Sequence, residues 1–132
     1  NIATACSMKE SFTVDLPSGR TLDYGRIKAQ EASMVAMMPR NGKKIPIKLW
    51  GGLVAENASQ ALARDIFSDM MLRVAAAGHR IVFHVHDELV VQANENDAEE
   101  VYKDIVQMMS KPPEWIDLPL EAEGSIIQRY EK

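Results

Sequence analysis

Apolar side chains recur at every fourth position through the middle of the chain. The series consists of Val54, Ala58, Leu62, Ile66, Met70 and Val74, with Phe67 and Met71 beside it. Side chains at this spacing fall on one face of an α-helix. The pattern therefore predicts a long helix over residues 53–77 that buries one face. Gly78 follows, and glycine adopts without Cβ strain the left-handed conformation that often ends a helix.

A different pattern begins at residue 80, where two short apolar runs flank a polar group. The runs cover residues 81–85 and 89–91, and the polar residues between them are His86, Asp87 and Glu88. This arrangement predicts a strand, a tight turn and a second strand. Because the runs are apolar on both faces, we expect both faces of the hairpin to be covered, which would bring the two acids near a core.

The N-terminal part of the chain carries weaker signals. Two β-prone runs, 12–16 and 21–24, surround a Pro-Ser-Gly turn and predict a hairpin. Residues 29–38 allow either a short helix or an irregular stretch before the break at Pro39-Arg40-Asn41-Gly42. Residues 45–50 are expected to be extended.

The C-terminal part predicts one more helix and one more strand. Acidic residues before position 98 favour a helix over 98–109, and two prolines at 112 and 113 stop it. Residues 118–123 are expected to form the last strand. The resulting order ββ-α-ββ-α-β predicts an α+β fold in which an antiparallel sheet packs on two helices.

Composition narrows the class of protein. The 132 residues correspond to one domain, and 46% hydrophobic with 26% charged residues is typical of a globular chain. No apolar stretch approaches the ~18 residues that a membrane span requires, so no membrane partner is expected. The single cysteine, Cys6, excludes an internal disulfide and suits a reducing compartment, which predicts a cytoplasmic protein.

Charge is unevenly distributed between the two parts of the chain. Residues 1–50 carry a net charge of +4 and residues 51–132 a net charge of −8, which together give −4. Such asymmetry is compatible with a basic face that meets phosphates. A solvated loop with additional lysines explains the same numbers.

Two adjacent acids at the tip of an apolar hairpin are the main chemical signal. A carboxylate near a core is costly unless it is paired, hydrogen-bonded or bound to a cation. Mg²⁺ is commonly held by one or two carboxylates together with substrate phosphates, which makes Asp87 and Glu88 candidate ligands. Aspartate is also a favoured turn residue because its side chain bonds the local backbone, and that structural role remains open.

The histidines of the same hairpin allow a second kind of metal site. His84 and His86 are two residues apart and would share one face of a strand, with Asp87 nearby. Such a set could hold Zn²⁺ or Fe²⁺. Alternatively, His84 is a packed histidine whose ring nitrogens are satisfied locally.

Four segments in one order resemble a known family. Val85-His86-Asp87-Glu88, followed by Leu-Val-Val, is similar to motif C of family A (DNA polymerase I-like) DNA polymerases of phage or bacterial type. Residues 50–65 resemble the long palm helix that precedes this motif, and residues 16–20 resemble the hairpin between the fingers and that helix. Residues 117–124 resemble the final palm strand. Together these segments extend over nearly the whole chain.

The resemblance implies roles for individual residues. Asp87 would be the motif C aspartate that helps hold two catalytic Mg²⁺ ions, and Glu88 a secondary ligand beside it. His86 would lie near the primer terminus. Gln60 would reach the minor groove, where the acceptors are shared by all base pairs. Further candidates for DNA contacts are Asn57, Arg20 and Arg64, and the lysines at 43, 44 and 48.

The chain also departs from the family pattern. An asparagine usually stands four residues before the position of Gln60, but here Glu56 stands there and Asn57 comes three before. Gly52 replaces an arginine that is often found one turn earlier. Motif A and the fingers helix are absent, and Asp23-Tyr24-Gly25 is like motif A only superficially. We therefore expect a hairpin and basic linker over residues 1–50, a palm core over 51–132, and no activity in the isolated chain.

The resemblance predicts part of a DNA-directed DNA polymerase that acts in DNA replication by two-metal catalysis. Its partners would be primer-template DNA, deoxynucleoside triphosphates and a separate or excised polymerase segment that carries motif A and the fingers. The location would be the cytoplasm, in a bacterial host if the source is a phage. Two alternatives remain: a non-catalytic palm relic that binds DNA or a partner, and a metal hydrolase that uses His84, His86 and Asp87.

Overall fold

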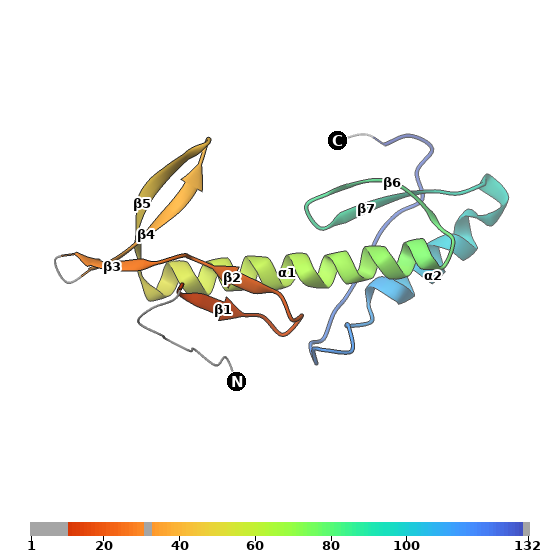
Figure 1. Cartoon of the computed structure of the whole chain (residues 1–132). Coiled ribbons are helices and arrows are strands. Elements are labelled where there is room, and N and C mark those ends of the chain that lie inside the picture. The colour runs from red at the N-terminus through yellow and green to blue at the C-terminus, as the bar shows by residue number, and fades with distance from the viewer. Residues whose placement is uncertain (1–10, 31–32, 131–132) are drawn as a thin grey trace. The chain divides into compact units, whose positions relative to one another are not determined.

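The computed structural model describes residues 11–30 and 33–130, and Figure 1 shows the path of the chain. The chain divides into two compact units, residues 1–63 and residues 64–132. The described residues form small antiparallel sheets, two α-helices and one short 3₁₀ helix. The predicted α+β class is therefore confirmed.

The first sheet of the first unit is the predicted N-terminal hairpin. Strands β1 (Thr13–Asp15) and β2 (Thr21–Asp23) pair antiparallel. The turn closes with a bond from the Leu16 amide to the Arg20 carbonyl at 2.8 Å. Gly19 takes a φ of +86°, which a residue with a side chain rarely adopts, so the turn depends on glycine here.

The second sheet of this unit contradicts the helix or irregular stretch expected over residues 29–38. Strands β3 (Ile27–Gln30), β4 (Ser33–Arg40) and β5 (Lys43–Leu49) form a three-stranded antiparallel sheet in that order. The basic linker is thus mostly sheet, and the extended segment expected at 45–50 is confirmed over 45–49. The chain folds back between β4 and β5 at Asn41 and Gly42, which both take positive φ, 51° and 74°. Two such residues make the hairpin turn whose twist matches that of the strands.

The core of the first unit joins both sheets to the start of the long helix. Its buried residues are Val14, Tyr24, Ala36 and Leu49. Helix α1 (Gly51–Ala76) begins directly after β5 and packs Leu53, Val54 and Ala58 against this core.

Helix α1 confirms the predicted apolar stripe and its end. Its buried residues are Ile66, Phe67, Met70 and Val74. Gly78 has a φ of +90°, and its amide bonds the Ala75 carbonyl at 3.0 Å. The His79 amide bonds the Val74 carbonyl at 3.3 Å, so the two bonds of a Schellman motif satisfy the last carbonyls of the helix.

The second unit contains the predicted hairpin and second helix. Strands β6 (Arg80–Val85) and β7 (Glu88–Gln92) pair antiparallel, with an irregularity between Ile81 and Phe83. The 3₁₀ helix η1 (Glu95–Asp97) leads into α2 (Ala98–Met109).

Polar contacts join α2 to the end of α1 and to the residue that precedes β6. The Arg73 guanidinium donates to the carbonyls of Met108 and Lys111 at 3.0 and 2.7 Å. His79 Nε2 lies 2.8 Å from Asp104 Oδ2. The two arginine bonds reach carbonyls at the end of α2 and just beyond it, where helical partners run out.

Two expectations about this unit are wrong. Neither face of the β6–β7 hairpin is fully covered by described residues, since Val82 is 55% and Phe83 is 36% exposed. Residues 118–123 do not form a strand. They pair with no strand among the described residues, and their bonds include that from the Ala122 amide to Ser110 Oγ at 3.2 Å.

Candidate active site

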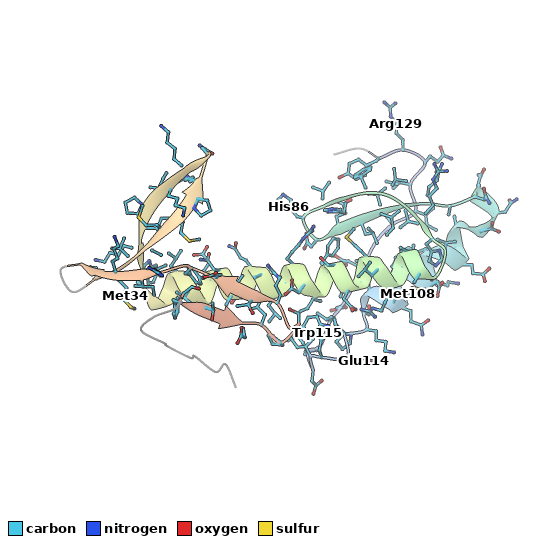
Figure 2. All side chains as sticks on the ribbon, in the orientation of Figure 1. Met34, His86, Met108, Glu114, Trp115 and Arg129 are labelled. Atoms are coloured by element: carbon cyan, nitrogen blue, oxygen red, sulfur yellow. The ribbon has the colours of Figure 1, made fainter. Side chains whose placement is uncertain are left out.

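The tip of the β6–β7 hairpin is a two-residue turn made by His86 and Asp87. Val85 and Glu88 are the last cross-strand pair before it. A turn of this length requires positive φ at its first residue, and His86 has a φ of 53°. Histidine tolerates this conformation better than most residues, although it costs on the order of 1–2 kcal/mol. Figure 2 shows His86 at the end of the hairpin.

Both acids of the hairpin are exposed to solvent, which corrects the expectation that they lie near a core. Asp87 and Glu88 are adjacent in sequence, and neither forms an ion pair with another described residue. Their charges therefore repel each other without compensation from a nearby cation. Exposure leaves their oxygens accessible to a cation or to a partner chain.

Tyr130 contacts Glu88 and was not foreseen from the sequence. Its phenol donates to Glu88 Oε2 at 3.4 Å, and its ring packs edge-on against Phe83 with centroids 4.9 Å apart. Partial burial raises the pKa of the Tyr130 phenol above its ordinary value of 10.0, and the charge and hydrogen bond of Glu88 raise it further. Glu88 therefore accepts a hydrogen bond from Tyr130, whereas Asp87 forms no ion pair with a described residue.

An apolar groove of about 530 Å³ borders the same acids. Strand β7, helix α2 and residues 122–130 form its walls, and Asp87 and Glu88 are among the lining residues. The apolar side chains that line it include Leu89, Val91, Val101, Ile105, Met109 and Ile127. No residue of α2 is buried, so its apolar face is only partly covered by the described residues.

The donor chemistry of the tip fits part of a Mg²⁺ site. Carboxylate oxygens are the ligands that this cation prefers, and two of them commonly act together with phosphates and water. Among residues 11–30 and 33–130, no three His, Cys, Asp or Glu side chains come together to hold a metal ion. Asp87 and Glu88 could therefore supply only some of the ligands.

The alternative metal site of His84, His86 and Asp87 is wrong, because the three side chains do not converge. His84 lies in β6, where its ring meets Phe67 edge-on at a centroid distance of 6.0 Å. His86 is in the turn beyond the strand. Residues two positions apart share a face only within a strand, and β6 ends at Val85, before His86.

The candidate DNA contacts at the start of α1 have partners within the first unit. Gln60 is exposed, and its amide donates to Glu56 Oε1 at 3.2 Å. The Asn57 amide donates to the hydroxyl of buried Tyr24 at 3.2 Å, which turns Asn57 toward the core. Gln60 belongs to a different unit from Asp87, and its contact with the minor groove stays a prediction.

The two arginine candidates differ in their surroundings. Arg20 Nη2 donates to the Ala61 carbonyl at 2.9 Å, which ties the β1–β2 turn to α1. Arg64 is exposed on α1. Its carbonyl accepts a bond from Ser68 Oγ at 2.8 Å.

At Gly52, where an arginine is often found in the family that the sequence resembles, a Cβ atom would lie 1.8 Å from the Trp50 ring. A larger side chain there would require the ring to shift. Trp50 itself is 60% exposed.

Comparison with known proteins finds that this chain is similar to part of a phage DNA polymerase. The chain is 35% identical to the DNA polymerase of Bacillus phage SP02 over 129 residues, which cover 90% of this chain. The matched part is 19% of that polymerase, so the chain spans about a fifth of its length. No protein-family model matches the chain, and no solved structure matches it. No helix among the described residues is long and apolar enough to cross a membrane.

Proposed function

We propose that this chain is the palm segment that carries motif C in a family A DNA polymerase, and that it acts in template-directed DNA synthesis. The proposal depends mainly on the 35% identity, over 90% of the chain, with a phage protein named DNA polymerase. The hairpin adds chemical support, since it presents two adjacent exposed carboxylates at a tight turn.

The residues of the tip would have different tasks. Asp87, which has no cation partner among the described residues, is the main candidate ligand for Mg²⁺. Glu88 is held by Tyr130 and would act as a secondary ligand. The left-handed backbone of His86 sets the direction of its ring, which could donate to a phosphate at the primer terminus.

The reaction forms a bond between the primer 3′-oxygen and the α-phosphorus of a deoxynucleoside triphosphate. The bond from that phosphorus to the bridging oxygen breaks, and pyrophosphate and a proton are released. Bound Mg²⁺ would supply neutralisation of the charge on the reacting oxygens. The contribution of this chain is to hold the carboxylates in place and to position the primer through His86 and Gln60.

The chain would need a second polymerase segment for activity. Two carboxylates are too few to position two metal ions, so further ligands must come from residues outside the described ones. The apolar groove beside α2 offers a surface on which such a segment could dock. A non-catalytic palm that only binds DNA or a partner is the alternative, and the incomplete set of ligands is equally compatible with it.

A chimeric polymerase tests the proposal. This chain would replace the matching segment of the Bacillus phage SP02 polymerase, and extension of a primed template would be measured. We expect extension with Mg²⁺, and its loss when Asp87→Ala is introduced. Glu99→Gln, which alters an exposed acid in the first turn of α2, is the matched control and should leave extension unchanged. A folded chimera whose activity does not depend on Asp87 would contradict the assignment.

A further inference from the structure

The register of the β3–β4–β5 sheet sorts its side chains into two different faces. Val35 of β4 lies directly between Lys28 of β3 and Lys48 of β5. Directly paired residues share a face of a sheet, as do residues two positions apart in one strand. Lys44 therefore belongs to the same face, which we call the basic face. The opposite face carries the core residues Ala36 and Leu49.

The three strands of this sheet carry basic residues and no acidic ones. Strands β3, β4 and β5 contain no Asp or Glu, and their cations are Lys28, Arg40, Lys43, Lys44 and Lys48. All five side chains are exposed. None of them forms an ion pair with a described residue. The basic face therefore presents positive charge directly to solvent.

The turn between β4 and β5 carries two more cations, Arg40 and Lys43, which belong to the opposite face by the same alternation and repel each other at a cost in stability. Arg40 and Lys43 are directly opposite each other across the ladder, and Lys44 is the next residue of β5. Like charges in directly opposite positions destabilise a sheet, and an anion bound between them would remove the repulsion. In Figure 1 the β4–β5 hairpin extends away from the start of α1, so its tip is accessible.

The dimensions of the basic face suit a polyanion rather than a small anion. Lys44 and Lys48 are separated by about 13 Å along β5, and Lys28 and Lys48 by about 10 Å across two strand spacings. These lysines are too far apart to enclose a single phosphate. Duplex DNA carries one charge for about every 1.7 Å of its axis, so several phosphates come within reach of the three lysines at once.

We propose that the basic face, formed by Lys28, Lys44 and Lys48, binds the phosphate backbone of duplex DNA independently of base sequence. The other described side chains of this face are Ser33, Val35, Met37, Pro39 and Pro46. Contacts between lysine ammonium groups and phosphate oxygens carry no sequence information, so binding is expected to be independent of base sequence. The inference rests on the proposed function in one respect, since similarity to a polymerase identifies the polyanion as DNA. The surface is separate from the tip that carries Asp87.

The test measures binding of a fluorescent duplex to the complete 132-residue chain by anisotropy over a range of salt concentrations. The variant Lys28→Gln/Lys44→Gln/Lys48→Gln removes the basic face. The control Lys103→Gln/Lys111→Gln/Arg129→Gln removes the same charge from exposed positions of the second unit. Circular dichroism of both variants establishes that they are folded.

We expect the first variant to bind at least about tenfold more weakly at low salt, and its log–log salt slope to fall by about 2–3, since each phosphate contact contributes about 0.9. The control should stay within twofold of the unmodified chain, and two unrelated duplexes should bind equally well. Equal weakening in both variants would overturn the proposal. So would an unmodified chain that binds polyglutamate but not DNA, because the face would then recognise an acidic protein.

The same measurement separates this inference from the proposed function. Glu99→Gln should leave duplex binding by the isolated chain unchanged, because Glu99 lies outside both the basic face and the hairpin tip. Duplex binding that depends on the basic face, together with an inactive folded chimera, would support the inference and reject the polymerase assignment. An active chimera would support the polymerase assignment. If the isolated segment then bound duplex equally well without the three lysines, the inference would be rejected.

Discussion

The core of the first unit and helix α2 of the second differ in how completely they bury their apolar side chains. In the first unit, residues from both sheets are buried together, and Ala36 has no exposed surface. In the second unit, α2 has no buried residue and Ile126 and Ile127 are about half exposed, at 48% and 54%. Exposed apolar surface of this kind usually marks an interaction site. The candidate catalytic acids line the groove beside this helix.

The largest effect is expected at the exposed tip of the second unit. Asp87→Ala should lower primer extension by the chimera at least about a thousandfold, which corresponds to about 4 kcal/mol of transition-state stabilisation. The melting temperature of the isolated chain should hardly change, because the acid is exposed and stands beside the like charge of Glu88. A large loss of stability with normal extension would assign Asp87 a structural role instead.

A pair of equal truncations compares the two apolar regions directly. Leu49→Ala removes a buried side chain from the core of the first unit and should lower the free energy of unfolding by about 2–5 kcal/mol. Ile105→Ala acts on the half-buried face of α2 and should cost about 1 kcal/mol or less in the isolated chain. Hydrogen exchange resolved by residue would measure each unit separately. Equal losses would refute the difference in coverage.

Within the second unit, Arg73 makes two of the polar bonds that attach the end of α2. Arg73→Met removes two charge-assisted bonds to the carbonyls of Met108 and Lys111 and an ion pair to Asp69 at 2.9 Å. We expect a loss of about 1.5–3 kcal/mol in chemical unfolding. Arg64→Met, at an exposed position of the same helix, should change stability by less than about 0.5 kcal/mol. Similar losses in both variants would show that the carbonyl bonds are unimportant.

The smallest expected effect is a change in titration. Glu88→Gln removes the charge that raises the pKa of Tyr130, so this pKa should fall toward 10.0 without reaching it, because partial burial remains. A raised phenol pKa stabilises the fold at pH below the unfolded value, and this contribution is lost as the pH rises through the folded pKa. Phenolate absorbance, corrected with Tyr130→Phe, would measure the shift. An unchanged pKa would exclude the contact with Glu88.

Elements defined by local pattern were predictable, whereas those that depend on distant partners were not. Helix α1 and the β6–β7 hairpin followed from spacing within the segments themselves. Strand β4 did not, because Met34, Val35, Met37 and Met38 are apolar on both faces, and only pairing with β3 and β5 decides which face is buried. Residues 118–123 have the composition of a strand but pair with no strand among the described residues, and their composition alone could not reveal this.

In the candidate site, too, residues marked by a local pattern could be predicted, and contacts between distant residues could not. Asp87 and Glu88 are adjacent to a turn signal and could be identified from sequence. Tyr130 is 42 residues from Glu88, and no local pattern connects them. The bond between Asn57 and Tyr24 spans 33 residues, and it turns toward the core a residue that the family resemblance assigned to DNA.

Every sheet in the described residues is built from strands that follow one another in sequence. Closing each hairpin fixes only a short loop, so its entropic cost is small. A topology with such local contacts folds faster than one that must pair distant strands. Hairpins form within microseconds and helices faster still, so these pieces could become ordered before they meet. Slow folding of the isolated chain would then point to late packing of α2 rather than to strand pairing.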